Sequence, residues 1–196
     1  MTILKNTVLR SILTEIVKTA SDDQTREHLN CVHFDERGMI ESTDGHRLVR
    51  VTLATPFSHG GSVSLADIAG VLAALKVGHK PGETEIQTTD KGVTFLVQGS
   101  IPTVYVPWDG SKFPPADKVI PQYTKGKKQS EGHFGINPRY LAEAMALCVA
   151  AGENSKKAGE AVIFFGDPLD PIVVTPGTVR WEGVKKVECI VMPMRV

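Results

Sequence analysis

The chain has 196 residues and a mass of 21.2 kDa, enough for one large domain or up to two small ones. Hydrophobic residues make up 41% and charged residues 22%, a balance that excludes extensive disorder. The 22 Lys and Arg residues equal the 22 Asp and Glu residues, so any field that attracts a polyanion must be local. No window approaches the ~20 apolar residues of a membrane-spanning helix, and we expect a cytoplasmic protein that neither crosses a membrane nor is exported.

The first part of the chain predicts a helix followed by three strands. Apolar residues recur at helical spacing from Val8 to Val17, which indicates an amphipathic helix. Leu29 to Phe34 and Gly38 to Ser42 alternate loosely around a tight turn and read as a hairpin. A third strand is predicted from Arg47 to Leu53.

The same pattern restarts after a Pro/Gly/Ser-rich break at residues 56–61. Val63 leads in, Ser64 can cap a helix with apolar positions from Leu65 to Leu75, and Gly78 closes it. Further strands are predicted at Thr84 to Thr88, Gly92 to Gln98 and Ile101 to Val106.

A polar segment from Tyr123 to Gly132, with three lysines, predicts a linker before a third restart. Phe134 to Ile136 reads as a strand, with Asn137 as N-cap and Pro138 at the first position of a helix that reaches Ala151. The last predicted strands are Ala161 to Phe165, Ile172 to Thr175 and Val187 to Met192. The strand–helix–strands pattern therefore occurs three times, at a period of roughly 60 to 70 residues. We expect an α+β fold with helices on one face of antiparallel sheets.

The densest polar cluster is Thr43-Asp44-Gly45-His46-Arg47-Leu48. Asp44 and His46 would suit acid–base chemistry, but Asp-Gly between two strands is strong turn chemistry. No nucleophile motif lies nearby, so a turn is the preferred interpretation and we expect no catalytic residue.

His28, Cys31 and His33 are spaced closely enough to suggest metal ligands. Strand alternation puts Cys31 and His33 on one face but leaves a fourth ligand missing, and no phosphate-binding glycine motif is present, so we expect neither metal nor cofactor. Cys31, Cys148 and Cys189 show no CxxC spacing, which favours reduced thiols.

Basic residues accompany all three predicted helices. They are either solvated side chains or weak, sequence-independent contacts to a DNA backbone, and composition does not decide between the two. The candidate DNA-facing residues are Arg10, Lys18, Lys76, Lys80, Arg139, Lys156 and Lys157.

Short strings in order resemble the bacterial DNA polymerase III β subunit, the sliding clamp. LNCVHFDERGMIESTDGHRLVRV (Leu29 to Val51) and GSKFPPADKVIP (Gly110 to Pro121) resemble parts of its middle domain. FGINPRYLAEAM (Phe134 to Met145) and the terminal IVMPMRV (Ile190 to Val196) are similar to the last half of its third domain.

The resemblance implies a sliding-clamp fold built from three βαβββ half-domain repeats. A clamp subunit has three domains of two halves each, so residues 1–121 would form one complete domain. Residues 122–133 would be a linker, and residues 134–196 a half domain resembling the end of the third clamp domain.

The resemblance also implies a peptide-binding pocket with flexible apolar side chains and with Arg47 and Arg195 at its rim. The alternative is that Met192 to Met194 is only a terminal strand packed on the core. The implied pocket residues are Leu29, Thr43, Gly45, His46, Arg47, Leu48, Pro114, Val119, Ile190, Met192, Pro193, Met194 and Arg195.

The expected function is a non-enzymatic platform that encircles or associates with double-stranded DNA without reading its sequence, and that binds short motifs of polymerase-like replication or repair proteins. An alternative is a non-encircling regulatory module that keeps the pocket. A remote third option is an enzyme that uses Asp44 and His46.

Counting halves predicts the assembly. A clamp ring has twelve halves, so three halves per chain imply a tetramer, in which the third halves pair about a two-fold axis and complete domains meet edge to edge. A dimer is possible, as is a monomer in which the third half folds back onto the first domain, and either would favour the regulatory alternative.

Overall fold

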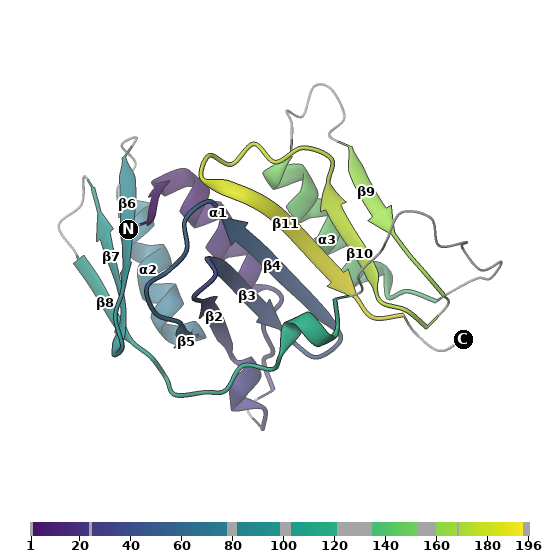
Figure 1. Ribbon diagram of the computed structural model, residues 1–196, viewed down its shortest axis with the longest axis horizontal. Helices are drawn as coiled ribbons and strands as arrows, with labels where there is room; N and C mark the ends of the chain where they lie inside the picture. Colours follow the sequence, from purple (N-terminus) through teal and green to yellow (C-terminus); the bar gives the residue numbers. More distant parts are fainter. Residues whose placement is uncertain are drawn as a thin grey trace.

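The computed structural model describes residues 2–23, 25–77, 82–98, 103–120, 135–152, 160–167 and 169–193. Helices and strands follow the repeated order expected from the sequence (Figure 1). The elements are β1 (Thr2–Lys5), α1 (Asn6–Val17), η1 (Glu27–Leu29), β2 (Cys31–Asp35), β3 (Met39–Thr43), β4 (Arg47–Leu53), β5 (Gly61–Ser64), α2 (Leu65–Val77), β6 (Glu83–Thr88), β7 (Gly92–Val97), β8 (Thr103–Pro107), η2 (Ala116–Lys118), α3 (Pro138–Ala151), β9 (Ala161–Phe164), β10 (Ile172–Pro176) and β11 (Val184–Val191).

Local sequence signals account for the helices. Leu9, Ile12 and Ile16 are fully buried on one side of α1, as its apolar periodicity predicts. At the start of α3 the Asn137 side chain accepts the backbone N–H of Arg139, and a proline occupies the first turn. The predicted N-cap is therefore confirmed.

The first two repeats complete each other by exchanging strands. We call β1–β4 with α1 unit one, and β5–β8 with α2 unit two. β1 of unit one pairs with β6 of unit two, and β5 of unit two pairs with β2 of unit one, in antiparallel fashion. Helices α1 and α2 pack against each other. Neither unit is complete without the other.

The third repeat, unit three, comprises α3 and β9–β11 and extends the sheet of unit one. Its strand β11 pairs antiparallel with β4 along most of their lengths, and the two strands lie side by side in Figure 1. This pairing produces a seven-stranded sheet in the order β5-β2-β3-β4-β11-β10-β9, beside a four-stranded sheet β1-β6-β7-β8. Unit three is thus joined to unit one edge to edge.

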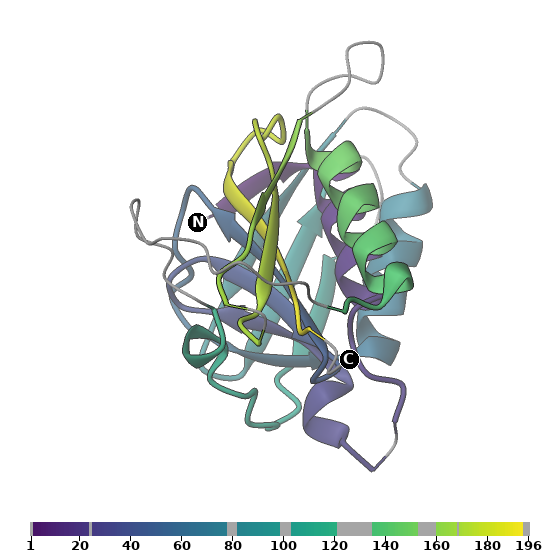
Figure 2. The ribbon, with the colours of Figure 1, turned by 90° about the vertical axis from the view of Figure 1, so that its right-hand side faces the viewer.

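The three helices lie on the same side of the seven-stranded sheet (Figure 2). One core runs beneath them through all three units, with Phe34, Phe95 and Leu147 among its fully buried side chains. The expected α+β class, with helices on one face of antiparallel sheets, is confirmed. No helix in the described ranges is long and apolar enough to cross a membrane.

Several expected boundaries shift. Strand β1 was missed because four residues with two apolar side chains carry too little periodicity. In the predicted strand from Phe134 to Ile136, Phe134 lies outside the described residues and Gly135 forms only an isolated bridge. Gly78 and the predicted linker 122–133 also lie outside them.

The three cysteines are buried and free, as expected.

Candidate functional site

The turn between β3 and β4 is built by its own polar side chains. The Thr43 hydroxyl donates to the carbonyl of Arg47 at 2.6 Å, and accepts the N–H of Gly45 at 3.0 Å. Asp44 Oδ1 accepts the backbone N–H groups of His46 and Arg47 at 2.8 and 3.0 Å. Gly45 has φ +90°, a conformation that favours glycine. The Asp44 carboxylate therefore shapes the turn and is not placed as a partner of the His46 imidazole.

The turn lies directly beside the C-terminal strand. Leu48 is opposite Ile190 and Arg47 is opposite Val191 in the β4–β11 register. Beyond the strand, Met192 N–H donates to the His46 carbonyl at 2.9 Å. Two stretches from distant parts of the sequence, both drawn from the predicted pocket, are thus brought into contact.

Side chains of this junction divide between the two faces of the sheet because strand residues alternate. On the face away from the helices, Leu48 and Ile190 are only 3% and 1% exposed. They form an apolar cluster, which we call the outer cluster, with flanking contacts from Phe113 and Ile120. The outer cluster consists of Leu48, Ala116, Val173 and Ile190.

The segment around η2 covers the outer cluster from outside. Ala116 is buried in the cluster, Pro114 is half-buried, and Val119 is 43% exposed beside it. The apolar surface still available to a ligand is therefore offered by exposed residues such as Val119 and by the half-buried Met192, and not by Leu48 itself.

Ion pairs fix the η2 segment to the sheet. Asp117 is 2.7 Å from Arg37 Nη1 and 2.7 Å from Arg50 Nη2, and Arg50 also pairs with the buried Glu41. The hydrogen bond from Arg37 lowers the pKa of the Asp117 carboxyl. Burial raises the pKa of Glu41, in spite of the adjacent Arg50. No local sequence pattern indicates this group of ion pairs, although alternation on β4 places Arg50 and Leu48 on one face.

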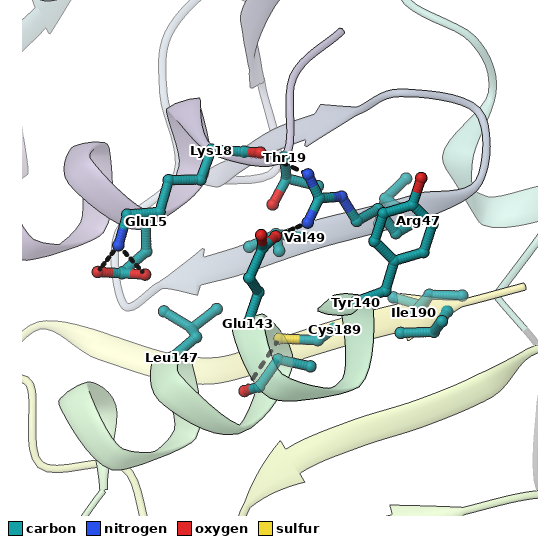
Figure 3. A pocket seen from close by; sticks show the side chains of 13 residues that line it. Glu15, Lys18, Thr19, Arg47, Val49, Tyr140, Glu143, Leu147, Cys189 and Ile190 are labelled. Carbon is teal, nitrogen blue, oxygen red and sulfur yellow. Dashed lines mark hydrogen bonds and ion pairs between the residues drawn. The ribbon is translucent and has the colours of Figure 1, made fainter. Parts of the chain in front are cut away.

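Arg47 lies on the opposite face, among the helices (Figure 3). Its Nε donates to Asp44 Oδ2 at 3.0 Å and its Nη2 to the Lys18 carbonyl at 2.6 Å. The guanidinium also pairs with Glu143 and stacks over the Tyr140 ring at 4.5 Å. The expectation that Arg47 sits at the rim of the peptide pocket is corrected: strand alternation turns it inward, where it connects α1, β4 and α3.

A hollow of about 320 Å³, part of it open to solvent, lies beside Arg47. Residues from α1, β4, α3 and β11 line it, and Glu143 and Leu147 enter from α3 (Figure 3). This hollow is on the helix face of the unit-one to unit-three junction. It is distinct from the outer cluster, which lies on the other face.

The remaining predicted pocket residues are partly accounted for. Leu29 is buried. Its Cδ1 methyl group lies 4.0 Å from the position that a Cβ atom on Gly45 would occupy, so Leu29 lies next to the turn. Pro193 is half-buried next to Met192. Met194 and Arg195 lie outside the described residues. Among the described pocket residues, Leu29 and Met192 both lie next to the Thr43–Leu48 turn.

The predicted DNA-facing residues are only partly free to attract phosphate. Arg10 and Lys76 are exposed and make no ion pair with another described residue. Lys18 pairs with Glu15 at 2.8 Å, and Arg139 pairs with Glu143. Lys80, Lys156 and Lys157 lie outside the described residues. Of the four described candidates, two are therefore already paired with a glutamate.

Within the described ranges, the candidate metal ligands His28, Cys31 and His33 do not come together as one group of ligand atoms. The nearest grouping in the described ranges is His33, Asp35 and Glu41, whose ligand atoms lie within 4.8 Å of one another. Arginine cations already occupy its carboxylates: Asp35 binds Arg37 and Glu41 pairs with Arg50. Burial lowers the pKa of His33, whose ring stacks on Phe113.

This geometry defines a class of protein in which βαβββ units share strands and their sheets join edge to edge. Within that class, the chain has the fold of the DNA polymerase III β sliding clamp, as the resemblance implied. The clamp of Caulobacter crescentus matches with a TM-score of 0.71 and 19% sequence identity, over 100% of this chain and 65% of that one.

Two other clamps match in the same way. The clamp of Bartonella birtlesii, solved bound to griselimycin, gives a TM-score of 0.70 at 18% identity over 99% of this chain and 65% of its own. The Bacillus subtilis clamp gives 0.67 at 16% identity, over 100% and 64%. The chain thus spans about two thirds of the length of these clamps. Neither protein-family models nor curated proteins show a match.

Proposed function

We propose that this protein is a non-enzymatic, clamp-like platform of the cytoplasm that binds short apolar motifs of replication or repair proteins and associates with duplex DNA through its helices. The observation that carries the proposal is the β4–β11 junction. It brings the Thr43–Leu48 turn into contact with Met192, and Leu48 lies in the outer cluster beside the segment that carries the exposed Val119. These are the residues that the resemblance assigns to the peptide pocket.

The platform needs no catalytic group in this interpretation. Asp44 and His46 are engaged through backbone hydrogen bonds of the turn. Encirclement of DNA would require several copies, and the tetramer expected from twelve halves remains the arrangement that we favour over a dimer.

The non-encircling regulatory module is the second candidate, and one observation favours it. Lys18 and Arg139 are each neutralised by a glutamate on their own helix, which weakens a DNA-facing surface. Such a module would bind partner proteins through the peptide site without binding DNA.

The peptide site is tested by its exposed residues. Griselimycin, to which the Bartonella birtlesii clamp was solved bound, and short peptides with two or three large apolar side chains serve as probes. Deletion of residues 192–196 removes the Met192 N–H that donates to His46 but leaves β11 intact. Val119→Lys adds a charge at the accessible edge. We expect each change to weaken probe binding by at least about tenfold, measured by calorimetry, because a few anchors dominate such sites.

Ile3→Lys is the matched control, because Ile3 is 45% exposed on β1, close to the 43% of Val119, and lies in the other sheet. It should bind the probes as the unaltered protein does. Unchanged affinity after both site alterations would contradict the proposed function.

A further inference from the structure

Two of the three cysteines lie next to each other between α3 and β11. Cys148 is on the buried side of α3, and Cys189 is on the part of β11 that this helix covers. Cys189 Sγ lies 3.9 Å from the carbonyl oxygen of Ala144, which is one helical turn before Cys148, and Figure 3 shows the sulfur directed at the helix. A helical side chain leans toward the N-terminus of its helix, so Cys148 Sγ lies over that same turn. We call the two residues the cysteine pair.

The two thiols of the cysteine pair influence each other's ionisation. The hydrogen bond between them lowers the pKa of Cys148, and the same bond together with burial raises the pKa of Cys189. Cys148 is therefore the member with the larger thiolate fraction, and the thiolate is the reactive form of cysteine. Cys31 in unit one differs, because burial raises its pKa to about 11 and its Sγ donates to the His28 carbonyl.

The hollow beside Arg47 gives a small oxidant a way to the cysteine pair. Cys189 lines this hollow, which is partly open to solvent (Figure 3). Hydrogen peroxide is neutral and little larger than water, so it enters such a space without the cost of burying a charge. The pair is thus buried but lies at the end of a path from solvent.

We propose that the cysteine pair is an oxidation site, at which hydrogen peroxide converts the two thiols of Cys148 and Cys189 into a disulfide. The Cys148 thiolate attacks one peroxide oxygen and the O–O bond breaks, which gives a sulfenic acid and, with the proton of the thiol, one water molecule. The Cys189 sulfur then attacks the Cys148 sulfur, the S–O bond breaks, and the second water molecule leaves with the proton of Cys189. The two thiols lose two electrons and two protons, and the peroxide takes up both. A thiol reductant reverses the reaction.

The disulfide would hold unit three together. It closes a loop of about 40 residues and joins α3 to the strand that pairs with β4. Both elements also contact unit one, α3 through Glu143 and Arg47, and β11 through β4. We expect the disulfide to raise the Tm by at least about 5 °C. This inference goes beyond the proposed function and does not depend on it, because it is measured by mass and thermal stability and not by binding.

Peptide mapping tests the bond directly. The reduced full chain is treated with hydrogen peroxide, its remaining thiols are blocked with iodoacetamide, and it is cut with trypsin without reduction. Cleavage after Lys and Arg places the three cysteines in separate peptides, 27–37, 140–156 and 187–195. Mass spectrometry should find 140–156 joined to 187–195, and Cys31 alkylated. Alkylation of all three cysteines, oxidation of the pair to sulfinic or sulfonic acid without a bond, or a bond that includes Cys31 would overturn the proposal.

Thermal unfolding of matched variants is the second test. Cys148→Ala and Cys31→Ala each remove one buried thiol. Peroxide should raise the Tm of the unaltered protein and of Cys31→Ala, and should leave that of Cys148→Ala unchanged. The mass of the oxidised protein, denatured without reduction, should remain that of one 21.2 kDa chain. An equal rise in both variants, no rise in the unaltered protein, or a mass of two chains would contradict the proposal; if Cys148→Ala does not fold, the peptide map of the unaltered protein decides.

Discussion

Arg47 shows how a single side chain can connect two units of a fold. Its guanidinium contacts Asp44 in its own turn, the Lys18 carbonyl at the end of α1, and Glu143 and Tyr140 on α3. A lysine has one ammonium group and cannot reach these partners together. Arg47 is therefore better described as a structural residue that connects units one and three than as a ligand-binding residue.

Removal of this side chain should destabilise the protein. Arg47→Ala leaves the partly buried Asp44 without its cation and Glu143 with Arg139 alone, and we expect a loss of about 3 kcal/mol in the free energy of unfolding. Arg47→Lys should lose roughly 1 kcal/mol, because the charge is kept and the hydrogen bond to the Lys18 carbonyl is lost. Urea denaturation measures both. Arg10→Ala, at an exposed position on α1, should change the value by less than about 0.5 kcal/mol. Equal free energies of unfolding for Arg47→Ala and Arg10→Ala would refute the structural role of Arg47.

Asp117 should make stability depend on pH in a defined direction. Its pKa is lowered by Arg37, so its contribution is present above the unfolded value of 3.8 and is lost as the pH falls through the lower folded value. Asp117 is half exposed, so the contribution is screened to about 0.5 kcal/mol. The unfolding free energies of the unaltered protein and Asp117→Asn should differ by this amount at pH 7 and converge well below pH 3.8. A constant difference across that range would assign the effect to packing.

For single residues, the sequence predicts which side chains take part in a turn or site better than it predicts the face of the sheet to which each side chain points. The Thr43–Leu48 turn follows from local chemistry, because Thr43 and Asp44 bond to backbone groups only two to four residues away. The inward direction of Arg47 depends on which face of β4 is covered by helices, and that is decided by contacts with α3, about a hundred residues later in the chain. Asp117 was missed for the same reason, since its partners are Arg37 and Arg50.

At the scale of elements, the helices and the long strands were predictable. α1 carries strong periodicity, α3 adds an N-cap at Asn137, and β4 was predicted with the bounds that it has. β1 and β5 are four residues each and gain their strand structure from pairing with β6 and β2. Short strands formed by exchange between units leave little local signal, because their stability comes from the partner.

The helix surfaces yield a prediction for DNA. Charge reversal at Arg10 and Lys76 together should lower the slope of log affinity against log salt by about 2, since each phosphate contact contributes about 0.9. Reversal at Lys18 or Arg139 should have a smaller effect, because Glu15 and Glu143 already compensate these charges. Fluorescence anisotropy on two duplexes of unrelated sequence measures the loss of DNA affinity, and this loss should be equal on both duplexes.

Lys91→Glu is the control, because Lys91 is exposed in the turn between β6 and β7 and away from the helix surfaces. It should leave the salt slope unchanged. A preference for one duplex, or binding that persists in high salt, would argue against sliding contacts. Complete absence of DNA binding would favour the non-encircling module.

At the scale of the whole molecule, the β4–β11 pairing has a consequence for the order of folding. Arg47 pairs with Val191 across most of the chain, so the strands meet only after a very long loop has closed. Loop closure of this length costs more entropy than the hairpins β2–β3 or β6–β7, and contacts of large sequence separation form slowly. The junction between units one and three should therefore be among the last parts to form. Because the proposed peptide site is assembled by that junction, partially folded or nascent chains would display no binding site, and a partner would engage only chains that have finished folding.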